Sequence, residues 1–259
     1  MSLKSRPSII CLIFLGAALL PASTALAGSC RDLLKSAFQH FNQFHQDPTQ
    51  ADQAVTDLQS ASADPSCAYE AQWNLANLYL NVGTALKDKK DKLARFKLGQ
   101  ESALKAIALN PNGREGHYFY AVNLGSQIDV DGVMKNLFKV KNLKSEIEKS
   151  LALDPNYAPA LVVKASYMHG LPGIVGGSDK QADELYRKAL KADPTCESAY
   201  LEYASFLIKL KRLDEAKKLL EDLQRPNFPH STISTWVAVD KPKLLDLLKR
   251  LAGAQAENK

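Results

Sequence analysis

The sequence predicts an all-α protein built as a solenoid of helical hairpins. Apolar residues recur at helical spacing along the chain, and no stretch alternates convincingly with the period of two that a strand requires. A short phrase that ends an amphipathic run also occurs three times, at residues 108–111, 152–155 and 192–194. Repeated helix ends of this kind indicate that one supersecondary unit is used again and again.

The first 27 residues have the features of an export signal. Lys4 and Arg6 form a basic start, residues 9–20 form an apolar core too short to cross a bilayer comfortably, and residues 25–27 (ALA) form a small-x-small cleavage motif. We therefore expect a signal peptide over residues 1–27. No later stretch is long and apolar enough for a membrane span, so none is expected in the mature chain.

The composition excludes several classes of protein. With 46% hydrophobic and 24% charged residues, the chain is an ordinary globular protein and not a disordered one. Its formal net charge of +5 is mild, and the basic residues do not cluster as they would on a nucleic-acid-binding face. Residues 87–92 (KDKKDK) mix both signs of charge, which predicts a solvated helix end.

Helical periodicity and helix-breaking prolines define the elements of the first half. Asp-Pro pairs at residues 47–48 and 64–65 end the first two helices, because proline cannot continue a helix. The third helix has the strongest apolar face, which includes Trp73 and Leu75. In order, the predicted helices cover residues 30–46, 51–63, 68–86, 93–109, 113–126 and 133–153.

A glycine-rich connection interrupts the second half. Residues 170–177 (GLPGIVGG) are longer and more apolar than a helical hairpin needs, and their four glycines allow positive φ angles. Ser178 then caps the following helix, with Gln181 completing a capping box. The remaining predicted helices cover residues 158–169, 178–194, 197–211, 213–223 and 242–254, with a compact connection around Pro226, Pro229 and Trp236.

Small, aromatic and proline residues recur at equivalent places in successive helices. The sets are Gln72, Leu75, Ala76 and Tyr79; His117, Tyr120, Ala121 and Leu124; Ala182, Tyr186, Ala189 and Pro194; and Tyr200, Tyr203, Ala204, Leu207, Ala216 and Leu220. This pattern resembles the tetratricopeptide repeat (TPR), a unit of 34 residues. Here the helix-ending prolines are 44, 39 and 32 residues apart, so the repeats are irregular. The resemblance implies a right-handed TPR-like solenoid of about four hairpins over residues 68–226.

The irregular segments resemble a particular subgroup. They are residues 117–125 (HYFYAVNLG), a long lysine-rich helix that ends before Pro155, and residues 172–177 (PGIVGG). Together they resemble the T-component (TatT-like) proteins of bacterial TRAP transporters, and the microtubule-dynamics regulators of eukaryotes look similar over the same region. The export signal favours the bacterial branch. The resemblance implies a periplasmic protein that associates with a solute-binding protein.

Cys30 has two competing uses. In an exported protein, two of the three mature cysteines (Cys30, Cys67 and Cys196) can pair. Cys30 and Cys67 each open a predicted helix, and a disulfide between them would close a loop of nearly forty residues and contribute about 3–4 kcal/mol. Alternatively, residues 27–30 (AGSC) are a degenerate bacterial lipobox, and a lipidated Cys30 could not form the bridge. We favour plain cleavage after Ala27.

The concave face of a solenoid, lined by the first helix of each hairpin, is its usual binding surface. Aromatic and amide side chains on such a face suit an extended peptide or a loop of a protein partner. By the repeat resemblance, the groove-facing positions are Tyr69, Trp73, Asn77, Asn81, Tyr118, Val122, Ser126, Ser166 and His169. The alternative is that Trp73 and Tyr118 belong to the core between repeats.

No cluster of residues predicts catalysis, a cofactor or a metal site. His40 and His45 are five residues apart and do not share a helix face, and the cysteines form no CxxC motif. No G-x-S-x-G elbow occurs, and the 170–177 loop lacks the Gly-Lys-Ser/Thr ending of a phosphate-binding loop. We therefore expect a non-catalytic exported adaptor that binds a protein partner.

The expected organisation has four parts: a signal peptide (1–27), an N-terminal helical pair (28–66), a TPR-like array (67–226) and a C-terminal connection with a capping helix (227–259). Two other functions are compatible with it. One is a general scaffold for envelope assembly, and the other is a small-molecule carrier with a site beneath the 170–177 loop. The sequence leaves association with a second copy of the chain open.

Overall fold

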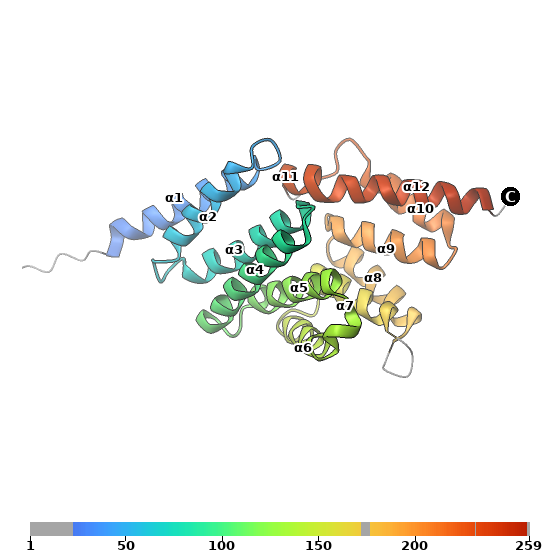
Figure 1. Ribbon diagram of the computed structural model, residues 1–259, viewed down its shortest axis with the longest axis horizontal. Helices are drawn as coiled ribbons and strands as arrows, with labels where there is room; N and C mark the ends of the chain where they lie inside the picture. Colours follow the sequence, from blue (N-terminus) through green and yellow to red (C-terminus); the bar gives the residue numbers. More distant parts are fainter. Residues whose placement is uncertain (1–22, 172–176, 231, 258–259) are drawn as a thin grey trace, which may run out of the picture.

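The computed structural model describes residues 23–171, 177–230 and 232–257 (Figure 1). Within these residues every regular element is helical and no strand occurs, which confirms the predicted all-α fold. Residues 1–22 of the predicted signal peptide lie outside the described residues. Residues 172–176, most of the apolar part of the glycine loop, also lie outside them.

The helices pair as hairpins in chain order. The N-terminal pair is α1 and α2, four further pairs run from α3 to α10, and α12 follows a short irregular connection. The first five helices are α1 (Ser23–Phe41), α2 (Thr49–Ala61), α3 (Ala68–Ala85), α4 (Lys89–Leu109) and α5 (Arg114–Asp131). The next five are α6 (Leu137–Leu153), α7 (Ala158–Gly170), α8 (Asp179–Ala192), α9 (Glu197–Lys209) and α10 (Leu213–Leu223). The chain ends with α11 (Ile233–Thr235), the π-helical segment η3 (Trp236–Asp240) and α12 (Lys241–Glu257).

The four central pairs form two layers. Helices α3, α5, α7 and α9 each contact the next in this series. Of the second helices, α6, α8 and α10 pack mainly on their own partners, and α4 packs on both α3 and α5. The first helices therefore form an inner layer and the second helices an outer one, as in a TPR array. We call the side of α3, α5, α7 and α9 that faces away from the outer layer the inner face.

Several element boundaries differ from the prediction. Helix α1 begins at Ser23 and not at residue 30, and α5 continues to Asp131 and not to residue 126. Helix α1 ends at Phe41, and turns continue to Gln46 in place of the expected helix, although Phe44 remains buried and stacks on Phe41 with ring centroids 5.7 Å apart. Helix α4 begins earlier, at Lys89, because the Asp88 side chain accepts hydrogen bonds from the backbone of its first turn. The expected helix over 133–153 is divided into a 3₁₀ turn, η1 (Val133–Asn136), and α6.

The cap of α8 forms only half of the predicted capping box. The Ser178 hydroxyl accepts a bond from the backbone N–H of Gln181, as predicted. The backbone N–H of Ser178, however, donates to the carbonyl of Met168 at 2.8 Å, so this group is not left for the Gln181 side chain. The glycine connection is thereby tied to the end of α7.

The core is divided between the two ends of the array. A large cluster joins buried residues of α5 to α12, a second cluster joins α1, α2 and α3, and a small one links α3, α4 and α5. Cys30 and Cys67 form a disulfide inside the second cluster, so it ties α1 to the start of α3. Cys196 is a buried free thiol.

A close helix approach fixes the junction of α4 and α5. Asn123 is fully buried and donates hydrogen bonds to the carbonyl oxygens of Ala76 (3.1 Å) and Phe119 (2.9 Å). Gly99 of α4 faces this amide, and a Cβ atom at Gly99 would overlap the Asn123 side chain. Gly253 of α12, in contrast, has no atom within 4 Å of the place where its Cβ would lie.

We predict that Gly99→Ala lowers the free energy of unfolding by about 2–3 kcal/mol, because the new methyl group displaces a buried, hydrogen-bonded amide. The matched change Gly253→Ala should instead raise it by about 0.5–1 kcal/mol, since alanine is the better helix former. Urea denaturation followed by circular dichroism measures both. Equal effects of the two changes would contradict this account of the α4–α5 contact.

Candidate functional site

The predicted groove residues lie on three inner helices. Tyr69, Trp73, Asn77 and Asn81 belong to α3, Tyr118, Val122 and Ser126 to α5, and Ser166 and His169 to α7. All nine side chains are half-buried. Within α3 and within α5 the spacing of four places the side chains on one helix face. The structure brings the α3 and α5 sets together, whereas Ser166 and His169 make their contacts with α8 and α9.

On α3, the two aromatic residues connect this helix to α5. The indole ring of Trp73 stacks on Phe119, with centroids 5.8 Å apart and planes within 3° of parallel. The Tyr69 hydroxyl donates to Oε2 of Glu115 at 2.8 Å, and burial together with this carboxylate raises the pKa of Tyr69. Trp73 therefore contributes to the packing between repeats, which was the alternative interpretation of this residue.

The amides of α3 form a short ladder. The side-chain nitrogen of Asn81 donates to the Asn77 side-chain oxygen at 2.8 Å and to the Asn77 backbone carbonyl at 2.9 Å. The side-chain N–H₂ group of Asn77 makes no hydrogen bond to the described residues. The Asn77 amide therefore retains hydrogen-bonding capacity for the backbone of a partner.

Tyr118 of α5 lies at the next junction along the array. Its ring meets Phe119 edge-on at 4.9 Å and Tyr157 edge-on at 5.2 Å. Burial, followed by the neighbouring Tyr157 and Cys196, raises the pKa of Tyr118 well above its ordinary value. A phenol in this environment stays neutral at physiological pH, so Tyr118 acts as an apolar and hydrogen-bonding surface and not as an acid.

The two α7 residues already have partners within the chain. Ser166 Oγ lies 3.0 Å from the Tyr186 hydroxyl, and it donates to the Val162 carbonyl at 3.0 Å. The Nδ1 atom of His169 lies 2.7 Å from a carboxylate oxygen of Asp179, and its ring packs edge-on against Phe206. These contacts tie the ends of the glycine loop together.

Charged residues outside the predicted set gather around Glu202. They are Asp129 of α5, Glu202 of α9, Asp240 of η3 and Lys243 of α12, and the Lys243 ammonium contacts the Glu202 carboxylate. Partial desolvation and Glu202 raise the pKa of Asp129. Burial, with Glu197 and Glu202 nearby, raises the pKa of Asp240 to about 7. Because four separate elements supply these groups, no local sequence motif could reveal them.

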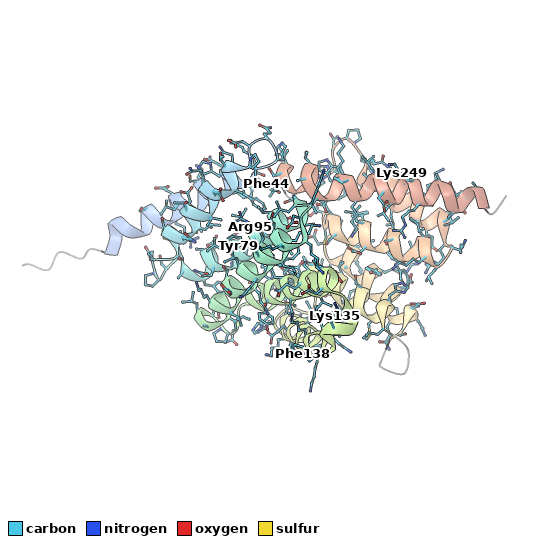
Figure 2. All side chains as sticks on the ribbon, viewed as in Figure 1. Phe44, Tyr79, Arg95, Lys135, Phe138 and Lys249 are labelled. Carbon is cyan, nitrogen blue, oxygen red and sulfur yellow. A yellow bond between two sulfur atoms is a disulfide. The ribbon has the colours of Figure 1, made fainter. Side chains whose placement is uncertain are left out.

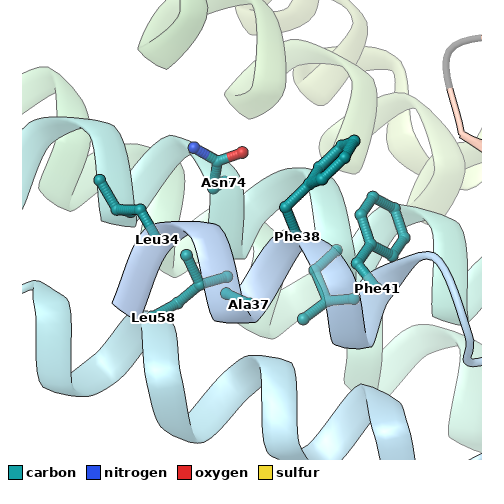
Figure 3. A pocket seen from close by; sticks show the side chains of 7 residues that line it. Leu34, Ala37, Phe38, Phe41, Leu58 and Asn74 are labelled. Carbon is teal, nitrogen blue, oxygen red and sulfur yellow. The ribbon is translucent and has the colours of Figure 1, made fainter. Parts of the chain in front are cut away.

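A hollow lies outside the predicted groove, between α1, α2 and α3 (Figure 3). Phe38, on its rim, is 53% exposed, which is unusual for a phenylalanine on an otherwise packed helix. The lining residues are Leu34, Ala37, Phe38, Phe41, Leu58, Asn74 and Leu78. Helical periodicity alone could not show that α1 leaves part of this surface uncovered.

The described residues hold neither a metal-binding cluster nor a membrane-spanning helix. No group of three or more histidine, cysteine, aspartate or glutamate side chains in that part of the chain is arranged to hold a metal ion. None of the helices in the same part is long and apolar enough to cross a membrane.

Two protein-family models match the chain. The model described as regulator of microtubule dynamics protein 1-3 matches residues 33–169, which is just over half of the sequence. A tetratricopeptide repeat model matches residues 180–232. The TPR part of the sequence-based interpretation is therefore confirmed, whereas neither model distinguishes the TatT-like subgroup.

Individual relatives are similar over shorter segments. Regulator of microtubule dynamics protein 3 of Xenopus laevis is 25% identical over 117 residues, covering 45% of this chain and 25% of that protein. Protein O-mannosyl-transferase TMTC3 of Homo sapiens is 24% identical over 161 residues, covering 58% of this chain and 16% of that protein. The chain thus spans a quarter or less of the curated relatives it matches.

A solved structure supports the fold. A thermophilic TPR protein of Thermus thermophilus superposes with a TM-score of 0.60 at 19% sequence identity, covering 88% of this chain and 99% of that one. At this level of identity the likeness concerns the arrangement of helices alone.

We predict that Asp240 makes the stability of the protein depend on pH. Its folded-state pKa of about 7 lies above the ordinary value of 3.8, so the folded state holds a proton that the unfolded chain releases. Stability should therefore fall as the pH rises from about 4 to 7, by on the order of 2 kcal/mol. Asp240→Asn should remove this decline, and Asp240→Glu should keep it. Urea titrations at pH 5 and pH 8 measure the difference; parallel behaviour of Asp240→Asn and the unsubstituted protein would contradict the assignment.

Proposed function

The chain belongs to the regulator of microtubule dynamics protein 1-3 family, and from this premise we propose that it is a non-catalytic adaptor that binds a protein partner on the inner face of its TPR array. The observation that carries the proposal is the two-layer stack itself. The inner helices α3 and α5 present aromatic and amide side chains within this stack, which suits a peptide or a loop of another protein.

The Asn77–Asn81 ladder and the adjacent aromatic rings are the proposed contact points. Asn77 keeps a free N–H₂ group for the partner's backbone, while Trp73 and Tyr118 supply rigid apolar area. The packing of these rings on Phe119 fixes their position before binding, which lowers the entropic cost of association. Both rings therefore have a structural and a binding role at once.

We further propose that the adaptor works after export, in a bacterial periplasm. The features of residues 1–27 support a cleaved signal peptide, and the Cys30–Cys67 disulfide is typical of an oxidising compartment. A bridged Cys30 is also the alternative to lipid anchoring at that residue. The partner we propose is the solute-binding protein of a TRAP-type transporter, on the resemblance of residues 117–125 and 172–177 to TatT-like proteins.

Two other functions have less support. A small-molecule carrier would need polar groups exposed near the glycine loop, yet the imidazole of His169 is already engaged by Asp179 and Phe206. A general scaffold for envelope assembly would use the same inner face with a different partner. The microtubule function named for the Xenopus laevis relative would appear here as an affinity for tubulin polymer.

We predict that the chain over residues 28–259 captures one solute-binding protein in near-equal amount from a periplasmic extract. Asn77→Arg should weaken binding of that purified protein at least tenfold in calorimetry, because the bulky cation fills the amide contact point, and it should leave the melting temperature unchanged. Asn142→Arg makes the same change on exposed surface of the outer helix α6 and is the matched control.

Three outcomes would contradict the proposal in different ways. Capture of envelope-assembly factors would favour the general scaffold, and cosedimentation with microtubules would favour the tubulin partner. Equal loss of binding in the Asn77→Arg and Asn142→Arg variants would show that the inner face is not the contact surface.

A further inference from the structure

The segment of residues 233–240, which comprises α11 and η3 and which we call the strap, joins the two ends of the array. Ser234 lies against the turn after α1: its Oγ accepts from the His45 backbone N–H at 3.3 Å and lies 2.7 Å from Nδ1 of the same residue. Two further strap residues pack on opposite cores, Ala238 on the N-terminal cluster and Trp236 on the C-terminal one. In Figure 1 the strap runs between the α1–α2 turn and α12.

The strap covers part of the inner face. It contacts α3 and α9, the first and last helices of the inner layer, which are not neighbours in the series α3, α5, α7, α9. The chain's own C-terminal segment therefore lies against two of the inner helices, one of which, α3, carries part of the proposed partner surface. Figure 2 shows the side chains of the described residues in the same view, with Phe44 of the turn after α1 labelled.

The strap is held more weakly than the helices on either side of it. Ser234 is its only buried residue, while Ile233 and Val237 are 61% and 41% exposed. Helix α12 is anchored separately, because Leu244, Leu247 and Leu251 are buried in the C-terminal cluster. The strap can therefore leave the inner face without removing the cap of the solenoid.

Polar and stacking contacts provide most of the remaining attachment. His230 lies 2.6 Å from the Glu197 carboxylate, and its ring stacks on Trp236 with centroids 3.8 Å apart. The electrostatic environment is less favourable at the C-terminal end of the strap. There the Asp240 carboxyl lies near Glu197 and Glu202 of α9, with Lys243 as the nearby cation. Contacts of this kind exchange with water more readily than buried apolar ones.

We propose that the strap is a displaceable internal ligand of the inner face, and that a protein partner docks by inserting a short helical segment in its place. This inference rests on the proposed function of the inner face as the partner surface. The contacts of the strap define the chemistry of the segment: a hydroxyl residue at one position, a small aliphatic residue four positions later on the same face, and an aromatic residue between them on the opposite face, as in Ser234, Ala238 and Trp236.

Hydrogen exchange measured by mass spectrometry on the chain 28–259 tests whether the strap opens alone. The amides of residues 233–240 should exchange well before those of α9 and α12. Ser234→Ala, which removes the bonds to His45, should speed strap exchange roughly tenfold. Ser60→Ala is the matched control, because its hydroxyl bonds only to Thr56 within α2. Exchange of the strap only together with α9 and α12 would overturn the proposal.

A second experiment tests the surface beneath the strap with a fluorescent synthetic peptide of residues 230–241. The peptide should bind the Ser234→Ala chain more tightly than the unsubstituted chain. A His45→Cys/Ser234→Cys chain, with its new disulfide mapped by mass spectrometry, should exclude the peptide when oxidised and bind it after mild reduction. Equal binding by the oxidised and reduced chains would overturn the proposal.

The two experiments separate this inference from the proposed function. If the peptide binds and the strap opens alone but no periplasmic protein is captured, the strap mechanism stands and the adaptor function fails. If a partner binds the oxidised, locked chain as tightly as the reduced one, the adaptor function stands and displacement of the strap is excluded.

Discussion

The structure depends on how closely its helices approach one another. At the junctions between helices, residues with little or no side chain allow this approach, and larger neighbours then fill the space around them. Fully buried alanines mark the junctions throughout the array: Ala71, Ala76, Ala103, Ala106, Ala121, Ala160, Ala165, Ala182, Ala189, Ala199, Ala204 and Ala216. Gly99 serves the same purpose opposite Asn123. Because packing density in a protein interior is high, an added methyl group at such a junction displaces a neighbour that has nowhere else to go.

The repeated small residues and prolines also explain why most of the fold could be predicted. These signals are local, because each involves only a few residues, and they predicted which segments form the hairpins from α3 to α10. Apart from the start of α4, which the local cap at Asp88 sets, the errors fall where a boundary depends on tertiary structure or on one backbone angle. Gly132, with φ of 93°, ends α5, and the helix expected over 133–153 begins instead with the 3₁₀ turn η1 before α6. Phe44 has the spacing of a helical residue but lies in the turn after α1. It is buried there all the same, because its side chain reaches the core without helical backbone geometry.

The candidate site was predictable only in part, for the same reason. The repeat pattern placed nine residues on the inner helices, but it could not show which of them the packing would engage. Trp73 on Phe119 is a contact between elements that are distant in sequence, and His169 on Asp179 is a contact across the glycine connection, whose course the sequence did not define. The cluster around Glu202 draws one residue each from α5, η3 and α12, so its raised pKa values arise only when the solenoid closes on itself.

A short solenoid needs its two ends held together, and it also needs an inner face that a partner can reach. A strap across the inner face bears on both requirements. An open array with few repeats leaves its two end clusters joined only through a chain of neighbouring contacts, so each repeat must be stable almost by itself. Contacts of the strap with both clusters add a direct link between the ends. The same link occupies the surface a partner needs, which means that binding must replace the contacts the strap provides. A partner segment with matching contacts restores the link between the ends, whereas one without them leaves the two clusters less firmly joined. The contacts of the strap therefore stabilise the free protein, and they also determine which partner segments can replace the strap.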